Sequence, residues 1–196
     1  MKADLGVVLT GATGGMGAAI ARALAPRSRS MLLVGRDAGK LAALAGELAR
    51  QCPAVELRTV SADLNSRDGR AAVVAAAEAL PGGVNLLVNN AGVGELCWFP
   101  DQSEAAIERI VQTNLLAPML LVRALLPQLL RPARARIVNV GSILGDIGHP
   151  GSVAYCASKF ALRGFTEALR RELAGGTVRV QYLAPRATRT ALNSPA

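Results

Sequence analysis

The sequence predicts an α/β fold, in which a parallel sheet is covered by helices, within a single domain spanning residues 1–196. Short aliphatic runs alternate with longer stretches of helical periodicity, a pattern typical of β–α–β units. Hydrophobic residues make up 51% of the chain but aromatic residues only 3%, so the core must consist mainly of Ala, Val, Leu and Ile. The length is sufficient for one domain with a substantial core.

The apolar runs and the helical periods give the expected elements in order. The strands are expected near residues 5–9, 30–34, 56–60, 85–89, 135–140 and 177–182. The helices are expected near residues 15–25, 38–50, 67–79, 102–130 and 152–174. This alternation implies right-handed crossovers between parallel strands.

The first expected strand, the turn after it and the first helix together predict a dinucleotide-binding unit. The apolar run at 5–9 is followed by Thr-Gly-Ala-Thr-Gly-Gly-Met-Gly at 10–17, and Met16, Ile20 and Leu24 then fall on one helix face. Glycines let the backbone approach a pyrophosphate, while the helix N-terminus offers N–H groups and a positive dipole end. Turns use glycine for many reasons, so it is the flanking strand and helix that favour a nucleotide site.

Proton-transfer chemistry is indicated near the end of the chain. Tyr155 and Lys159 are four residues apart and therefore share a helix face, and Ser142 precedes Tyr155 by thirteen residues. A lysine ammonium beside a phenol favours the phenolate, so Lys159 is expected to lower the pKa of Tyr155 toward neutrality. Ser142 can supply a hydroxyl to the same substrate oxygen. Proton transfer at an oxygen is half of carbonyl reduction or alcohol oxidation, and a hydride is the other half.

These motifs resemble the short-chain dehydrogenase/reductase family, in its classical, ketoreductase-like branch, from about residue 5 to Thr190. The family motif Thr-Gly-x-x-x-Gly-x-Gly is matched at 10–17, although Gly11, Gly14 and Gly17 also fit the spacing of the extended, epimerase-like branch. The tetrapeptide Asn89-Asn90-Ala91-Gly92, expected after the fourth strand, marks the ketoreductase-like branch.

The resemblance implies a Rossmann-type, doubly wound sheet with strand order 3-2-1-4-5-6. That order opens a ligand crevice between the first and fourth strands, and the glycine turn, the segment 89–92 and Ser142 should all meet at the same sheet edge. Family members usually continue into a substrate lid, a further helix and a seventh strand. Because the sequence stops at Ala196, the final strand and the lid are expected to be absent, through truncation or through real loss.

The resemblance also assigns roles. The expected catalytic tetrad is Asn114, Ser142, Tyr155 and Lys159. Tyr155 would give or take the proton, Lys159 would also hold the nicotinamide ribose, and Asn114 would bend its helix and hold a water of a proton relay. The alternative for Asn114 is a polar residue on a solvated helix face. The expected cofactor-binding positions are Gly11, Thr13, Gly15, Met16, Gly17, Arg36, Asp63, Leu64, Asn90, Ala91, Gly92, Tyr155, Lys159, Pro185 and Thr190.

The end of the second strand favours NADP(H), with NAD(H) possible. NAD-preferring members carry an acid where this chain has Gly35, whereas Arg36 can pair with a 2′-phosphate. Asp37 lies near the spacing of a ribose-binding acid, and its alternative role is to cap the next helix. Asp63 is implied to hold the adenine amino group, and helix capping is an equally weighted reading of it.

Other positions bear on the substrate. Val93, Leu96, Trp98, Ile143 and Leu144 indicate an apolar pocket. Arg186 stands where the family usually has a glycine that approaches the nicotinamide. It could reach a cofactor phosphate or a substrate acid, or it could simply be tolerated there. His149 is not assigned a catalytic role.

The net charge of +8 does not by itself indicate nucleic-acid binding, because the arginines are scattered and no aromatic platform accompanies them. Cys52, Cys97 and Cys156 lack metal-site spacing, so no metal is expected and a reducing compartment is indicated. No signal peptide is visible. The apolar stretch at 115–130 is interrupted by prolines and an arginine, so no membrane span is expected and the protein is predicted to be cytoplasmic.

The sequence therefore predicts an NADP(H)-dependent oxidoreductase that interconverts a ketone or aldehyde and an alcohol, acting on a small-molecule substrate. The alternative is a catalytically impaired, dinucleotide-binding regulatory or scaffold protein, motivated by Arg186 and the missing lid. A homo-oligomer is expected through the helices at 102–130 and 152–174. This form is predicted to be a dimer, and a full-length form a tetramer.

Overall fold

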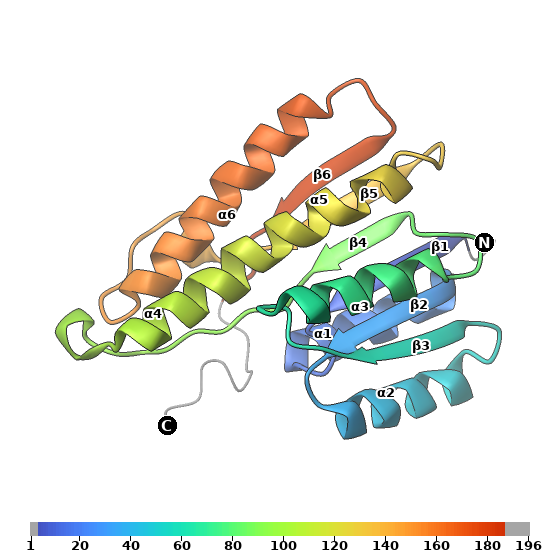
Figure 1. Cartoon of the computed structure of the whole chain (residues 1–196), viewed down its shortest axis with the longest axis horizontal. Helices are drawn as coiled ribbons and strands as arrows, with labels where there is room; N and C mark the ends of the chain where they lie inside the picture. The colour runs from blue at the N-terminus through green and yellow to red at the C-terminus, as the bar shows by residue number, and fades with distance from the viewer. Residues whose placement is uncertain (1–3, 187–196) are drawn as a thin grey trace.

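A computed structural model describes residues 4–186 as a parallel six-stranded sheet with helices on both faces (Figure 1). The strands are β1 (Leu5–Thr10), β2 (Ser28–Gly35), β3 (Glu56–Ser61), β4 (Leu86–Asn89), β5 (Ala135–Val140) and β6 (Val178–Leu183). Their spatial order is β3-β2-β1-β4-β5-β6, which confirms the predicted doubly wound topology. That order reverses between β1 and β4, the position at which doubly wound sheets bind their ligands.

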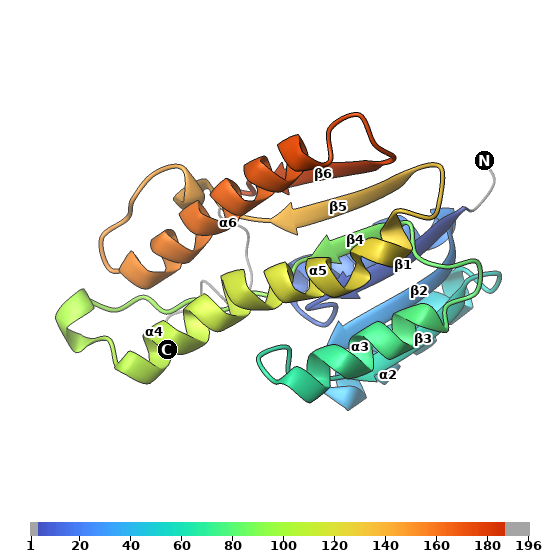
Figure 2. The same ribbon diagram turned by 45° about the horizontal axis from the view of Figure 1, so that its top comes forward.

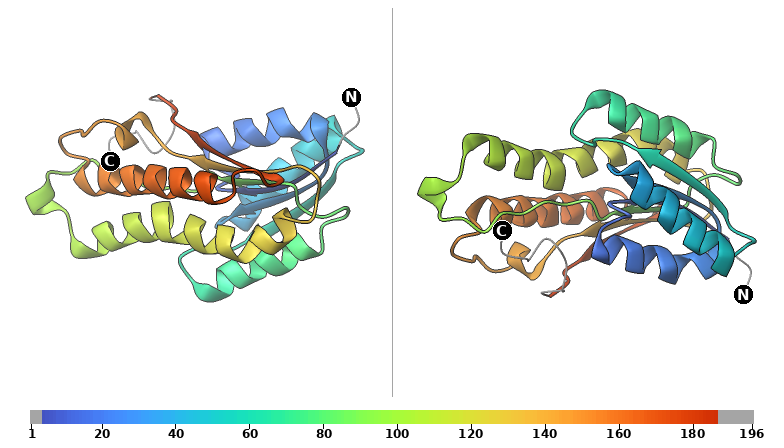
Figure 3. Two further views of the ribbon diagram at one scale, coloured as in Figure 1. Left: turned by 90° about the horizontal axis from the view of Figure 1, so that it is seen from above. Right: turned by 90° about the horizontal axis from the view of Figure 1, so that it is seen from below.

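The helices divide into two layers. They are α1 (Gly15–Leu24), α2 (Ala38–Gln51), α3 (Arg67–Glu78), α4 (Glu104–Val111), α5 (Ala117–Leu129) and α6 (Val153–Glu172). Helices α1 and α2 cover one face of the sheet, and α3, α5 and α6 cover the other (Figure 3). Because successive strand residues point to opposite faces, Val7 and Leu9 enter the first layer while Val8 enters the second. The core is aliphatic, as the composition requires.

The long helix expected at 102–130 differs from the prediction. It starts at Glu104 after the N-cap Ser103, and a single π-helical turn at Gln112–Leu116 separates α4 from α5. The π turn contains Asn114, whose buried side chain is held by a backbone segment outside the helix. A local propensity argument cannot anticipate such a turn, because the contacts that hold it lie far along the chain.

Helices α4 and α5 run beside α6 in two views of the molecule (Figures 1 and 2). The combined run Glu104–Leu129 is long and apolar enough to cross a membrane by length and composition, with a mean hydropathy of 1.4, but core helices of soluble proteins pass the same test. Here Leu121, Leu125 and Leu129 are buried in the core. The predicted cytoplasmic location stays a prediction.

Candidate active site

The glycine turn is shaped for close approach at the N-terminus of α1. Gly11 has a φ of 64°, a conformation that favours glycine. A Cβ on Gly17 would lie 2.0 Å from the carbonyl oxygen of Gly11, so only glycine permits this packing. Gly14 and Gly15 are exposed, and the first turn of α1 carries no acidic side chain. The site therefore fits an anionic pyrophosphate, which an acid here would repel.

The segment after β4 is tied to this turn by side-chain hydrogen bonds. The hydroxyl of Thr10 accepts from the backbone N–H groups of Asn90 and Ala91, each at 3.0 Å. In return, Nδ2 of Asn90 donates to the carbonyls of Thr10 and Gly11, each at 3.1 Å. The two motifs that the sequence placed at one sheet edge are therefore in direct contact.

The end of β2 settles the role of Asp37 in the fold. Oδ1 of Asp37 accepts from the backbone N–H of Lys40 at 2.9 Å, and this hydrogen bond lowers the pKa of the Asp37 carboxyl. The N-cap alternative is thus confirmed. Arg36 is exposed, with its carbonyl accepting from the hydroxyl of Ser61 at 2.9 Å. A Cβ on Gly35 would stand 3.2 Å from Oγ1 of Thr13, so a side chain there would require the Thr13 side chain to shift by a few tenths of an ångström.

The turn after β3 contains Asp63 and Leu64, which were expected to contact the adenine of the cofactor. Oδ1 of Asp63 accepts from the backbone N–H of Asn65 at 3.0 Å, so this carboxylate organises the turn. The N-cap of α3 is Ser66, whose hydroxyl accepts from the N–H of Gly69 at 2.9 Å and donates to the carbonyl of Asp63 at 3.0 Å. Asp63 therefore lies in the helix-capping region, as the alternative reading expected, but is not itself the cap. Leu64 is 8% exposed and belongs to the core between the sheet and α3.

Lys159 is the charged member of the candidate tetrad, and it is buried, with 4% of its surface exposed. Its ammonium donates to the carbonyl oxygen of Val140 at 3.0 Å and lies 5.6 Å from the ring centroid of Tyr155. Burial lowers the pKa of Lys159 to about 8, because the low-dielectric surroundings disfavour the charged form. A Cβ on Gly92 would lie 3.5 Å from Nζ, which brings the segment after β4 beside the ammonium.

Tyr155 corrects one expectation. Burial raises its pKa above the ordinary value, and a polar contact with the Ser142 side chain only partly opposes this. The predicted net lowering is therefore wrong for this structure, because desolvation of the phenolate has the largest effect on the pKa of Tyr155. The ammonium is also engaged with the carbonyl of Val140. At neutral pH the phenol is a protonated donor, as reduction of a carbonyl requires.

Asn114 is buried at 1% exposure, so the alternative of a solvated polar residue is wrong. Its Oδ1 accepts from the N–H of Val93 at 2.8 Å, and its Nδ2 donates to the carbonyl of Val93 at 2.8 Å and to the hydroxyl of Ser158 at 3.0 Å. The helix is interrupted at Asn114 by the π turn, while the bend and the water relay implied for this residue stay predictions. Asn114 thus fixes the loop after Gly92 against α6.

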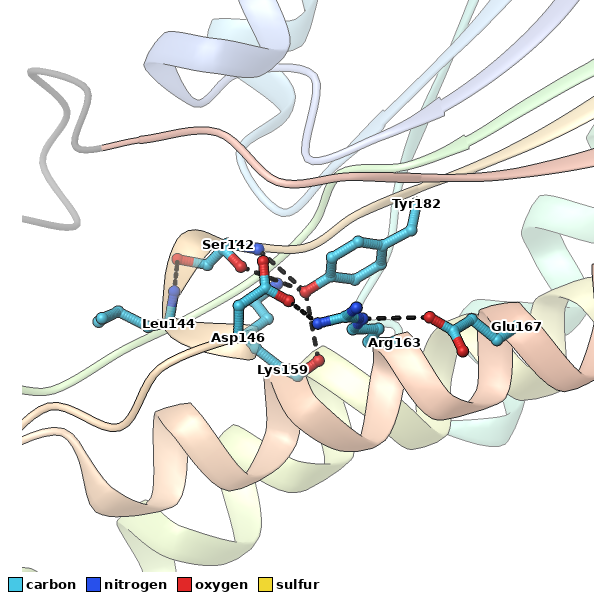
Figure 4. A network of polar contacts seen from close by, with 7 residues as sticks. All are labelled: Ser142, Leu144, Asp146, Lys159, Arg163, Glu167 and Tyr182. Carbon is cyan, nitrogen blue, oxygen red and sulfur yellow. Dashed lines mark hydrogen bonds and ion pairs between the residues drawn. The ribbon is translucent and has the colours of Figure 1, made fainter.

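Ser142 follows β5 and caps the short helix Ile143–Gly145, its hydroxyl accepting from the N–H of Leu144 at 3.1 Å. The sequence did not predict that Tyr182 would contact the backbone of Ser142. Tyr182, from the end of β6, directs its hydroxyl to the backbone of Ser142 and Lys159 (Figure 4). The available signal was a pair of glycines, Gly141 and Gly145, that flank Ser142 closely enough to leave space for an aromatic ring.

A buried polar chain below the site was also missed. Nδ2 of Asn89 donates to Oδ1 of Asn139 at 2.8 Å, and Nδ2 of Asn139 donates to the hydroxyl of Thr166 at 2.9 Å. The three side chains link β4, β5 and α6 with at most 4% exposure. No local sequence signal marks them as a group, because they are distant along the chain.

The remaining predicted positions lie around the site or outside it. Leu96 and Trp98 are 78% and 68% exposed, so these two side chains do not enclose the expected apolar pocket in the described structure. The carbonyl of Pro185 accepts from the N–H of Ile143 at 3.2 Å, beside Ser142. Thr190 lies outside the described residues. Within residues 4–186, His, Cys, Asp and Glu side chains form no group of three that could hold a metal ion.

The fold and these groups define a dinucleotide-binding enzyme site, and comparison with known proteins agrees. The family model described as short chain dehydrogenase matches residues 6–196. Nodulation protein G of a Rhizobium species is 37% identical over 91% of this chain and 71% of its own, and ketoacyl reductase HetN of a Nostoc species is 36% identical over 91% and 62%. A short-chain dehydrogenase from Sphingobium yanoikuyae, solved in complex with NADPH, superposes with a TM-score of 0.89 at 32% identity over 96% of this chain and 73% of that one. The chain belongs to the short-chain dehydrogenase family, whose members are oxidoreductases.

Proposed function

We propose that the chain is an NADP(H)-dependent oxidoreductase that interconverts a ketone or aldehyde and an alcohol by hydride transfer. The observation that carries the proposal is the meeting of Tyr155, Ser142 and the buried ammonium of Lys159, next to the segment after β4 that is hydrogen-bonded to the glycine turn. Tyr155 would donate the proton to the substrate oxygen in reduction and accept it in oxidation. The hydroxyl of Ser142 would donate a second hydrogen bond to the same oxygen as its charge develops.

The dinucleotide would supply the hydride when bound. The glycine turn at 11–17 would hold its pyrophosphate at the N-terminus of α1, and Lys159 would donate to the nicotinamide ribose. Lys159 has a second effect on proton transfer. A positive charge 5.6 Å from the Tyr155 ring favours the phenolate as it forms, even though burial sets the resting pKa high.

Arg36 supports NADP(H) over NAD(H). It is exposed directly after β2, and the strand end carries Gly35 where an NAD-preferring protein would carry an acid. The carboxylate of the adjacent residue, Asp37, is already engaged with the N–H of Lys40. An unopposed guanidinium at this edge favours a 2′-phosphate. The NADPH complex of the Sphingobium enzyme adds support by similarity.

The test is a spectrophotometric assay of NADPH oxidation with a panel of carbonyl compounds that includes a reactive diketone. Tyr155→Phe keeps the ring and removes only the hydroxyl, so NADPH binding should survive while reduction falls by at least about a hundredfold. A Tyr155→Phe variant that reduces a responsive substrate at nearly the wild-type rate would contradict the proposed mechanism. Failure of the wild type in a single turnover with bound NADPH would instead favour the alternative, a dinucleotide-binding protein without turnover.

We also propose that the protein is a homo-oligomer through α4, α5 and α6. Several large apolar side chains on these helices and the turn between them are exposed by 37% to 45%, namely Val111, Leu116, Met119, Val153 and Phe160. Because α4 and α6 pack side by side, these residues supply apolar surface to two neighbouring helices. Pairing with a second copy would remove that surface from water.

A further inference from the structure

We infer that Tyr182 is a positioning residue, which sets where the Ser142 hydroxyl stands relative to the Tyr155 phenol. The inference rests on the proposed function, in that it assigns Ser142 and Tyr155 to the reacting oxygen. Tyr182 would touch neither substrate nor cofactor, and it would act through the backbone of the two elements that carry the reacting groups.

The contacts of the Tyr182 hydroxyl carry the inference (Figure 4). Oη of Tyr182 accepts from the backbone N–H of Ser142 at 3.3 Å. The single hydroxyl hydrogen faces two acceptors, the carbonyl oxygens of Ser142 and Lys159, each at 3.3 Å. One phenol from the end of β6 thus joins the loop after β5 to α6, one helical turn beyond Tyr155.

The ring of Tyr182 occupies a slot that two glycines leave open. A Cβ on Gly141 would lie 2.0 Å from Cζ of Tyr182, and a Cβ on Gly145 would lie 2.1 Å from its Oη. Real Cβ atoms are not found at such distances, so the loop can hold its present place only with glycine at both positions. Because the glycines stand on either side of Ser142, the ring limits the movement of the loop that presents the serine.

The surroundings keep the Tyr182 phenol neutral and fixed. Burial raises its pKa above the ordinary value, so it acts as a hydrogen-bonding group and not as an acid near neutral pH. Arg163 on α6 forms ion pairs with Asp146, at the end of the Ser142 loop, and with Glu167, at 3.1 Å for the latter. This exposed network is a second link between the loop and α6, on the solvent side of the phenol.

A double-mutant cycle separates positioning from simple stabilisation. Tyr182→Phe keeps the ring in its slot and removes the hydroxyl, so we expect a kcat lowered about tenfold, with the Kd for NADPH changed less than twofold. In a Ser142→Ala background the same change should lower kcat less than twofold, because the group that it positions is gone. Gln181→Ala, an exposed neighbour on β6, is the matched control and should leave kcat unchanged. An equal loss in both backgrounds overturns the inference.

A second readout needs no activity. The chain has two tyrosines, so Tyr182→Phe leaves Tyr155 as the single phenol, and Tyr155→Phe leaves Tyr182. Ultraviolet titration of phenolate absorbance then follows the remaining phenol of each variant, and the wild-type curve minus the Tyr155→Phe curve gives the titration of Tyr155 in the presence of Tyr182. Since the contact with Ser142 lowers the pKa of Tyr155, displacing that serine by Tyr182→Phe should move the Tyr155 titration to higher pH. An unchanged Tyr155 titration overturns the inference. Absence of carbonyl reduction in the wild type would defeat the proposed function alone, and this titration would still decide the role of Tyr182.

Discussion

The buried lysine should make the stability of the protein depend on pH in a direction that can be worked out in advance. The pKa of Lys159 falls from its ordinary value of 10.5 to about 8 in the folded chain. Below pH 8 Lys159 is protonated in both the folded and the unfolded chain, and the folded chain is destabilised by the buried ammonium. Between about pH 8 and 9.5 the folded chain has released a proton that the unfolded chain keeps, so the free energy of unfolding rises with pH. At about 1.4 kcal/mol per pH unit, the rise over about 1.5 units is about 2 kcal/mol.

Lys159→Met isolates this contribution. The variant also leaves the carbonyl of Val140 without its partner, but that loss does not change with pH. Urea unfolding followed by far-ultraviolet circular dichroism, from about pH 7 to 9.5, should therefore give a wild-type minus variant difference that increases by about 2 kcal/mol. Lys40→Met changes an exposed lysine on α2 and is the matched control, whose difference from wild type should stay level. Parallel pH curves for wild type and Lys159→Met would refute the reasoning.

The remaining predictions concern the cofactor, the Tyr182 slot and assembly. Arg36→Ala should weaken NADPH binding by about tenfold or more and NADH binding little, as titration of both cofactors would reveal, and an equal loss would remove the 2′-phosphate assignment. Gly141→Ala should destabilise the fold by about 1–3 kcal/mol in denaturant unfolding, because its methyl meets the Tyr182 ring, and adding Tyr182→Ala should relieve that overlap. If the two effects simply add, the slot is not the cause. Light scattering should find a dimer at micromolar concentration, and Phe160→Glu should shift it toward monomer. A monodisperse wild-type monomer would count against the helix-pair interface.

The parts of this molecule that the sequence predicted are those fixed by local pattern plus topology. Apolar runs and helical periods gave the strand and helix order, and the family resemblance then fixed their arrangement in space. The contact between Thr10 and Asn90 follows from the same logic, because carboxyl ends of adjacent parallel strands meet at one edge. The sequence left two roles open for Asp37, a ribose-binding acid or the N-cap of the next helix. The hydrogen bond from the N–H of Lys40 shows that it is the N-cap.

The features that the sequence did not predict depend on contacts between residues far apart along the chain. Tyr182 is 40 residues from Ser142, and its role follows from the space left by two glycines. The pKa of Tyr155 was expected to fall from the spacing of Lys159, but spacing carries no information about burial. The π turn at Asn114 likewise results from its hydrogen bonds to Val93, which local helix propensity does not contain.

A common principle connects these findings, namely that the site is held by side chains that bind backbone. Asn114 holds Val93, Tyr182 holds Ser142, and Lys159 holds the carbonyl of Val140. Backbone groups are present whatever side chain stands at a position, so these contacts should persist when Leu96 and Trp98, which the sequence predicts to line an apolar pocket, are changed. Those two side chains are largely exposed and contribute little to the core. Substitutions there should therefore alter which carbonyl compounds are accepted while leaving the stability of the fold nearly unchanged.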